Sequence, residues 1–134
     1  MQANNIESPH KSKTGLVRIW RAFFYSLEGF AAALKYEHAF RQELILCLVL
    51  LPFAIFLQLE LVEKIILVIT LLFVLVVELL NSAIEAIVDR VSLENNELSK
   101  RAKDLGSAAV FLSVVVTAIA WILLAGPAMA ELFF

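Results

Sequence analysis

Three long hydrophobic segments constrain the fold of this 134-residue chain more than any other feature. They cover about residues 37–59, 64–90 and 104–126, and short polar stretches separate them. A helix needs about 20 apolar residues to cross a hydrocarbon core roughly 30 Å thick. Hydrophobic residues make up 61% of the chain, whereas soluble domains contain about one half. The sequence therefore predicts an all-α membrane protein with three transmembrane helices.

The two ends of the chain are predicted to lie outside the folded unit. Residues 1–13 are polar and are expected to form a disordered tail. Gly126 and Pro127 are expected to end the third span, because proline cannot continue a helix without losing a hydrogen bond. Residues 127–134 then form a C-terminal tail, and one membrane domain covers residues 14–126.

Residues 14–35 have the periodicity of an amphipathic helix. Apolar side chains such as Trp20 and Phe23 recur on one face, and Arg18 and Arg21 lie on another. A helix with one aromatic face and one basic face suits the plane of the membrane interface. We therefore expect a surface helix ahead of the first span.

Basic residues are distributed unequally among the polar segments. Six Lys and Arg residues lie at or before the start of the first span, and four lie between Arg90 and Lys103. The turn between the first two spans has only Lys64. By the positive-inside rule, the N-terminus and the 91–104 loop are predicted to be cytoplasmic and the C-terminus external.

The second span carries a stripe of polar side chains in its cytoplasmic half. Its members lie within roughly 100° of one another on a helix that advances 100° per residue. They are Glu78, Asn81, Ser82, Glu85 and Asp89. A carboxylate at bilayer depth is unfavourable by about 2.5 to 3.5 kcal/mol, so such groups usually face a protein interior and carry function.

The other two spans begin with charged residues at the same depth. Glu37 and Glu43 lie at the start of the first span, and Lys103 and Asp104 at the start of the third. A single polar residue often only links two membrane helices, but this group is larger. Grouped carboxylates suit Mg²⁺, which proteins hold with one or two carboxylates plus substrate phosphates.

Several other classes of site are disfavoured. The chain has four glycines and no glycine-rich phosphate loop, so side chains and a metal would have to hold any nucleotide phosphates. His10 and His38 are isolated and Cys47 is the only cysteine, which disfavours a zinc site. The net charge of −2 gives no reason to expect nucleic-acid binding.

Two stretches, ELLNSAIEAIVDR (78–90) and ENNELSKRAKDLGSAAV (94–110), closely resemble the signature region of the small bacterial integral-membrane diacylglycerol kinases. The segment EHAFRQE (37–43) is similar to a further stretch of that family. The resemblance covers about residues 15–125. It implies a homotrimeric helical bundle with shared active sites in the bacterial cytoplasmic membrane. Such an enzyme phosphorylates diacylglycerol from ATP with Mg²⁺ and yields phosphatidic acid.

The resemblance also implies roles for individual residues. Glu78 matches the general base, and Asn81 lies beside it. Lys103 and Asp104 match the pair near the nucleotide, with Lys103 on the phosphates. The positions that match metal-binding carboxylates on the ATP are Glu37 and Glu85. Further nucleotide contacts are implied for Arg18, Tyr25, Glu94, Asn95 and Asn96. The implied lipid site is lined by Arg18, Ser26, Glu43, Glu78, Ser107 and Trp121.

Three alternatives differ from this interpretation. Relatives that phosphorylate undecaprenol share the same core, so a polyprenol is an alternative acceptor. A transport or channel subunit could use carboxylates to bind cations, but the charged residues gather at one edge and do not form a path across the bilayer. A purely structural membrane protein would have no activity for Glu78→Gln to abolish.

Overall fold

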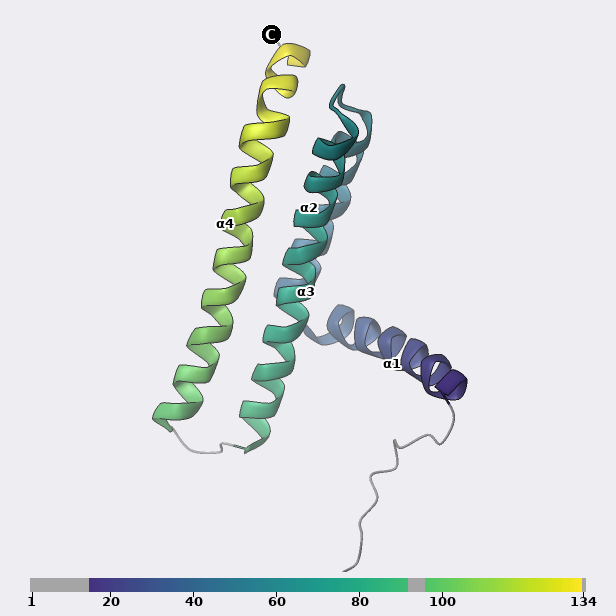
Figure 1. Ribbon diagram of the computed structural model, residues 1–134. Helices are drawn as coiled ribbons and strands as arrows, with labels where there is room; N and C mark the ends of the chain where they lie inside the picture. The colour runs from purple at the N-terminus through teal and green to yellow at the C-terminus, as the bar shows by residue number, and fades with distance from the viewer. Residues whose placement is uncertain (1–14, 92–95, 134) are drawn as a thin grey trace, which may run out of the picture.

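The computed structural model describes residues 15–91 and 96–133, which fold into four α-helices without any strand (Figure 1). In chain order they are α1 (Gly15–Tyr36), α2 (His38–Phe56), α3 (Leu61–Val91) and α4 (Glu97–Phe133). The last three are each long and apolar enough to cross a membrane. The all-α fold with three candidate spans is therefore confirmed. The predicted N-terminal tail and the two loop residues Glu94 and Asn95 lie outside the described residues.

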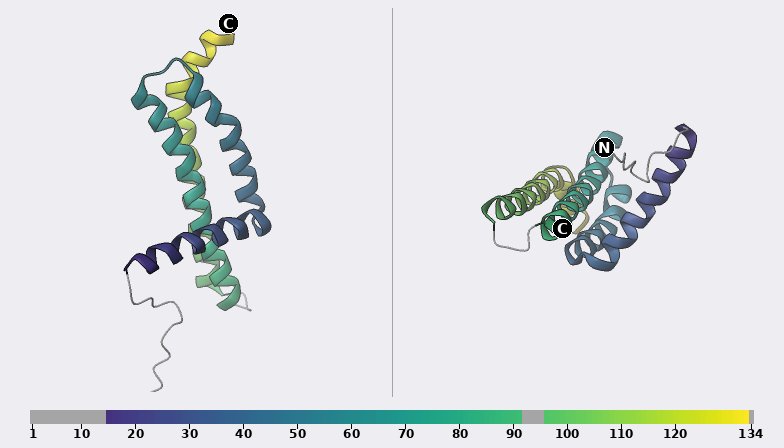
Figure 2. Two further views of the ribbon diagram at one scale, coloured as in Figure 1. Left: turned by 90° about the vertical axis from the view of Figure 1, so that its right-hand side faces the viewer. Right: turned by 90° about the horizontal axis from the view of Figure 1, so that it is seen from below.

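The central helix of the bundle is α3. It packs against α4 along much of its length and against α2 on its other side. Seen from below, α3 lies between these two helices (Figure 2). By contrast, α1 leaves the bundle at a steep angle and contacts mainly α2. The arrangement resembles a layer of three antiparallel helices with a fourth helix lying across one end.

A sharp corner separates α1 from α2. Glu37 has an extended backbone (φ −99°, ψ 111°), so the helix cannot continue through it. The Arg41 Nη1 atom donates hydrogen bonds to the carbonyl oxygens of Leu34 at 3.0 Å and Lys35 at 3.2 Å. These carbonyls belong to the last turn of α1, whose acceptors lack partners within the helix. Arg41 thus joins the end of α1 to the first turn of α2.

Small and hydroxyl side chains form the contact between α3 and α4. Gly106 and Ser113 of α4 are buried in it. The Thr117 hydroxyl is shared between the carbonyl oxygens of Thr70, at 3.1 Å on α3, and Ser113, at 2.9 Å. Small residues let membrane helices approach closely, and polar hydrogen bonds then link them. Further along, apolar residues form a core of Ala54, Leu57, Leu67, Leu71, Trp121 and Ala125.

The prediction that Gly126 and Pro127 end the last helix is wrong. The helix α4 continues through Gly126 and Pro127 to Phe133, so residues 127–133 do not form a separate tail. Ala128 and Met129 pack against the apolar core, and this burial holds the last two turns in place. Proline is tolerated in membrane helices because neighbouring groups offset its missing hydrogen bond.

Candidate active site

Carboxylates from two helices converge at the end of the bundle where α1 crosses it. Glu78 on α3 is only 4% exposed. It interacts electrostatically with Glu85, about two helical turns further along α3, and with Glu37 at the corner before α2. It also interacts with Glu43 on α2, one of whose carboxylate oxygens is buried without a hydrogen-bond partner in the described part of the chain. The structure therefore brings together four of the predicted site residues.

Asn81 is held between α3 and α4. Its Nδ2 atom donates a long hydrogen bond of 3.4 Å to Glu85 Oε1, one helical turn away. Its Oδ1 atom faces Gly106 on α4, where a Cβ atom would overlap it. Among the described residues, this buried Oδ1 has no hydrogen-bond donor. Gly106 is thus required for the close approach of α4 to the Asn81 amide. The Oδ1 atom remains available inside the site as a hydrogen-bond acceptor for a ligand.

The lysine of the site is paired with a residue that the family resemblance did not assign. Lys103 on α4 forms an ion pair with Asp89 Oδ1 on α3 and also interacts electrostatically with Glu85. Asp104, the neighbouring residue, is exposed. The ion pair places the Lys103 ammonium group at the edge of the carboxylate cluster, where an incoming anion could share it.

A pocket of about 540 Å³ lies next to this cluster, between α1 and α3. Its walls consist mainly of small residues such as Gly29, Ala33 and Ala83. Glu37 and Ser82 line it as well, and the Ser82 hydroxyl is buried without a partner in the residues described. The volume is in the range of small-molecule sites, about 300 to 1,000 Å³. The pocket thus has an apolar body with polar groups where it meets the carboxylates.

Of the other predicted residues of the nucleotide site, two are exposed on α1 and one has a structural role. Arg18 and Tyr25 are on exposed positions of α1. The Asn96 side chain accepts a hydrogen bond of 2.8 Å from the Leu98 amide, as a residue that caps the start of a helix does. Asn96 therefore helps to start α4.

The predicted lipid-site residues are also divided. Ser26 lines the pocket between α1 and α3, and its hydroxyl donates to the Ala22 carbonyl oxygen at 2.9 Å. Ser107 is exposed on α4. Trp121 belongs to the apolar core, and a helix that rises 1.5 Å per residue places it about 22 Å along α4 from Gly106, which faces Asn81 one turn from Glu78. Within one chain, Trp121 is thus remote from Glu78.

The donor set at the site fits a hard divalent cation. Glu37 and Glu85 both interact with Glu78, and oxygen ligands are what Mg²⁺ prefers. In residues 15–91 and 96–133, no group of three or more acidic, histidine or cysteine side chains could enclose a metal by itself. A Mg²⁺ site made of one or two carboxylates, water and phosphate oxygens remains compatible with this geometry.

Three site residues were not assigned from the sequence, namely Ser82, Asp89 and Gly106. The helical periodicity already put Ser82 and Asp89 on the polar face of α3, which was the available signal. Gly106 carried no such signal, because its importance depends on which residue of α3 it faces.

Three apolar spans with a buried carboxylate, an amide and a lysine at one end are typical of a membrane enzyme. The model of the prokaryotic diacylglycerol kinase family matches residues 24–125, and the chain belongs to that family. The chain is similar to the diacylglycerol kinase of Pseudomonas aeruginosa, with 53% identity over 114 residues, which cover 85% of this chain and 93% of the relative.

Two other relatives are more distant. The diacylglycerol kinase of Escherichia coli K12 is 45% identical over 111 residues, or 83% of this chain and 91% of the relative. The diacylglycerol kinase of Helicobacter pylori 26695 is 37% identical over 118 residues, which cover 88% of this chain and 91% of the relative. The chain is therefore a lipid kinase, and its apolar helices make it a bacterial membrane protein.

Proposed function

We propose that this protein transfers the γ-phosphoryl group of ATP to the free hydroxyl of diacylglycerol and so produces phosphatidic acid. The observation that carries the proposal is the burial of Glu78 among further carboxylates, beside a pocket with an apolar body. The names of the similar proteins support diacylglycerol as the acceptor and do not favour a polyprenol.

Glu78 acts as the general base in the proposed reaction. Its carboxylate accepts the proton of the lipid hydroxyl while the oxygen forms a bond to the γ-phosphorus, and the bond between that phosphorus and the departing ADP breaks. The transition state of such transfers is loose, so positioning and charge neutralisation provide most of the catalysis. The Asn81 amide orients the Glu85 carboxylate through the hydrogen bond that it donates to it. Lys103, at the edge of the cluster, attracts the phosphates.

Glu37 and Glu85 are the residues that would hold Mg²⁺ next to the phosphates. When bound, this ion offsets the negative charge on the phosphate oxygens. The lack of a side-chain hydrogen bond from Glu37 to the start of α2 supports this assignment, because its carboxylate is not used for capping. Asp104, Arg18, Tyr25 and the loop residues 94–96 are proposed to complete the nucleotide site.

The lipid is proposed to enter from the bilayer through the pocket between α1 and α3. Its walls of Gly29, Ala33 and Ala83 leave space for an acyl chain, and Ser26 and Glu37 lie where a glycerol backbone would need polar contacts. An α1 helix in the membrane interface would let ATP reach the site from the cytoplasm while the acyl chains stay in the membrane. The enzyme would thus reside in the inner membrane with its site on the cytoplasmic side.

A homotrimer with shared sites is part of the proposal. Only 17%, 28% and 22% of the residues in the most apolar windows of α2, α3 and α4 are buried in the single chain. The single chain buries Glu78 and Asn81 but leaves Glu85 and Asp89 of the polar face of α3 partly or fully exposed, which favours an assembly that covers them. In such an assembly, Ser107 and Trp121 of a neighbouring copy could reach the lipid bound by this one.

Phosphate transfer from radiolabelled ATP to dioleoylglycerol in mixed micelles tests the proposal. We expect product with the wild type and with Glu28→Gln, which changes an exposed carboxylate of α1, and none above background with Glu78→Gln. Phosphate transfer to undecaprenol and not to dioleoylglycerol would show that the natural acceptor is a polyprenol. Equal turnover in all three proteins would show that Glu78 is not the base.

A further inference from the structure

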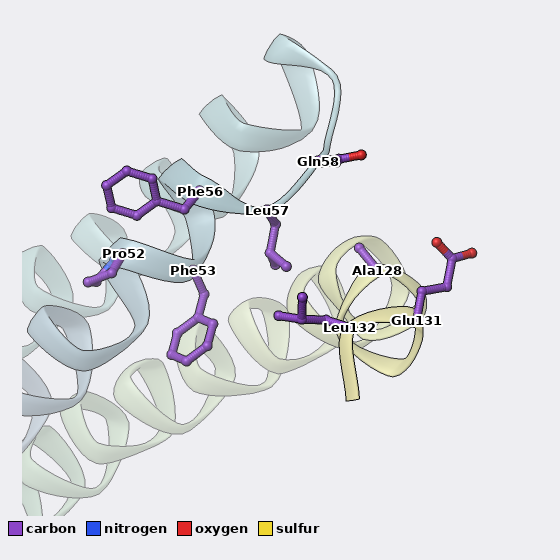
Figure 3. A pocket seen from close by; sticks show the side chains of 8 residues that line it. All are labelled: Pro52, Phe53, Phe56, Leu57, Gln58, Ala128, Glu131 and Leu132. Carbon is purple, nitrogen blue, oxygen red and sulfur yellow. The ribbon is translucent and has the colours of Figure 1, made fainter. Parts of the chain in front are cut away.

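A second pocket lies at the opposite end of the molecule from the carboxylates. It has a volume of about 560 Å³ and is formed by the end of α2 and the last two turns of α4. Phe53, Leu57 and Leu132 point toward its interior (Figure 3). The polar lining residues are Gln58 and Glu131, which lie on one side of the opening. The pocket is therefore amphipathic, with an apolar body and one polar edge.

The length of α4 indicates where this pocket lies relative to the membrane. The helix has 37 residues, so it is about 55 Å long, compared with a hydrocarbon core of roughly 30 Å. With Lys103 and its charged neighbours at one boundary, about 20 residues of α4 cross the core, which brings Gly126 near the other boundary. The pocket wall from Ala128 to Leu132 then lies at the depth of the lipid headgroups.

The polar edge of the pocket is negative. Glu131 lies in the last turns of α4, where the helix dipole already concentrates negative partial charge. The last turn of α4 contains no basic residue, and none of the residues that line the pocket is basic. An acidic side chain at the end of a helix is unfavourable unless a cation lies nearby. The charge at this edge is complementary to a ligand that carries a positive group.

We propose that this pocket binds a phospholipid whose headgroup carries a primary ammonium group. One acyl chain lies between Phe53 and Leu132, and the ammonium contacts the Glu131 carboxylate. The Gln58 amide is available to donate to the lipid phosphate or ester oxygens. The α4 wall lies beyond residue 125, the last residue that the family model matches. The proposal does not depend on the kinase reaction, because its residues are at the other end of the spans.

Native mass spectrometry of the full-length protein in detergent tests the headgroup preference. The probes are dioleoyl phosphatidylethanolamine and dioleoyl phosphatidylglycerol, which have the same chains and differ in headgroup charge. We expect the wild type to retain the ethanolamine lipid about fivefold more tightly, as for a partly exposed charge pair. Glu131→Gln should abolish this preference. Glu60→Gln, which changes an exposed carboxylate outside the pocket at the same end of the bundle, should preserve it.

A second pair of variants tests whether the acyl chain occupies the pocket. Ala128→Phe fills the space, because Ala128 lines it, and should lower the binding of both lipids severalfold. Ala130→Phe adds the same side chain at an exposed position of the same helix and should leave binding unchanged.

Three results would overturn the proposal. They are equal affinity of the wild type for the two lipids, a preference that survives Glu131→Gln, and unchanged binding in Ala128→Phe. A change of oligomeric mass in Ala128→Phe would instead assign the pocket to a contact between copies and would also reject a lipid site. Kinase activity is the folding control for each variant. Neither Glu131 nor Ala128 lies near Glu78, so we expect the variants to keep this activity, and lipid binding is the readout.

Discussion

Most of the buried polar side-chain atoms without a partner in the described residues lie at the active-site end of the molecule. They are Glu43 Oε2, Asn81 Oδ1 and Ser82 Oγ, and the fourth such atom is Trp121 Nε1 in the apolar core. Leaving such an atom unpaired costs about 1 to 3 kcal/mol, and three of them within one region indicate groups that a ligand is meant to satisfy. Their position around Glu78 agrees with the proposed transfer of a phosphoryl group to a lipid hydroxyl.

Glu78 and Glu85 are expected to differ in which kinetic constant they control. Glu78→Gln removes the proposed base and should lower kcat by about 10² to 10⁴, with little change in MgATP binding. Glu85→Gln removes a proposed metal ligand and should raise the KM for MgATP by on the order of tenfold or more. Steady-state kinetics at varied MgATP concentration separates the two effects. If both variants changed only KM, the assignment of Glu78 as base would fail.

Gly106→Ala should destabilise the protein, since the new methyl group would overlap Asn81 Oδ1. Overpacking of this kind costs about 1 to 3 kcal/mol, and it should also lower activity by moving the amide away from Glu85. Gly126→Ala is the matched control on the same helix, because its Cβ would meet no atom within 4 Å. Thermal unfolding in detergent, followed by the lipid kinase assay, distinguishes the two. Equal melting temperatures would argue against the close contact between α3 and α4.

The sequence predicted residues of the site within one helix better than contacts between helices. Helical periodicity placed Glu78, Asn81 and Glu85 on one face because their spacing alone determines it. The partner of Lys103 could not be predicted in this way. It depends on how far α4 is rotated and shifted relative to α3, and periodicity contains no information about either.

Arg41 acts at the scale of whole elements, since it joins α1 to α2. Arg41→Gln should weaken these bonds and loosen the end of α1 next to Glu37. Hydrogen exchange should become several times faster in residues 30–36, because the carbonyls of Leu34 and Lys35 lose a charged donor. Arg21→Gln changes an exposed arginine in the N-terminal part of α1, away from the corner, and is the control. If exchange were unchanged in Arg41→Gln, the corner would owe its geometry to other contacts.

The existence of each helix could be predicted from the sequence, but several boundaries could not. The helix α2 ends at Phe56 and not near residue 59, and α4 begins at Glu97, inside the predicted loop, and not near residue 104. The apolar segments are so long that only membrane helices accommodate them, and the predicted break between residues 35 and 37 corresponds to the break at Glu37 between α1 and α2. The end of α4 was missed because Gly126 and Pro127 are local signals. Packing of Ala128 and Met129 against the core, a tertiary contact, outweighed them.

The whole molecule is expected to have a fixed orientation, with the start of α4 in the cytoplasm and its end outside. Labelling of single cysteines in a Cys47→Ser background tests this. Ala130→Cys should react with a membrane-impermeant maleimide in intact spheroplasts, and Glu97→Cys only after lysis, because the basic residues near Glu97 stay inside. The reverse pattern would invert the topology and place the carboxylates on the external side.

Gly106 covers Asn81 only after α4 has been synthesised, so the polar face of α3 is incomplete when α3 leaves the ribosome. During that interval Glu78 and Glu85 would meet lipid or the insertion machinery without a neighbouring helix. We therefore expect α3 and α4 to enter the membrane together as a hairpin. A message truncated after codon 96 should yield a chain that cellular proteases remove quickly. For this protein, the last helix to be translated is the one that completes insertion.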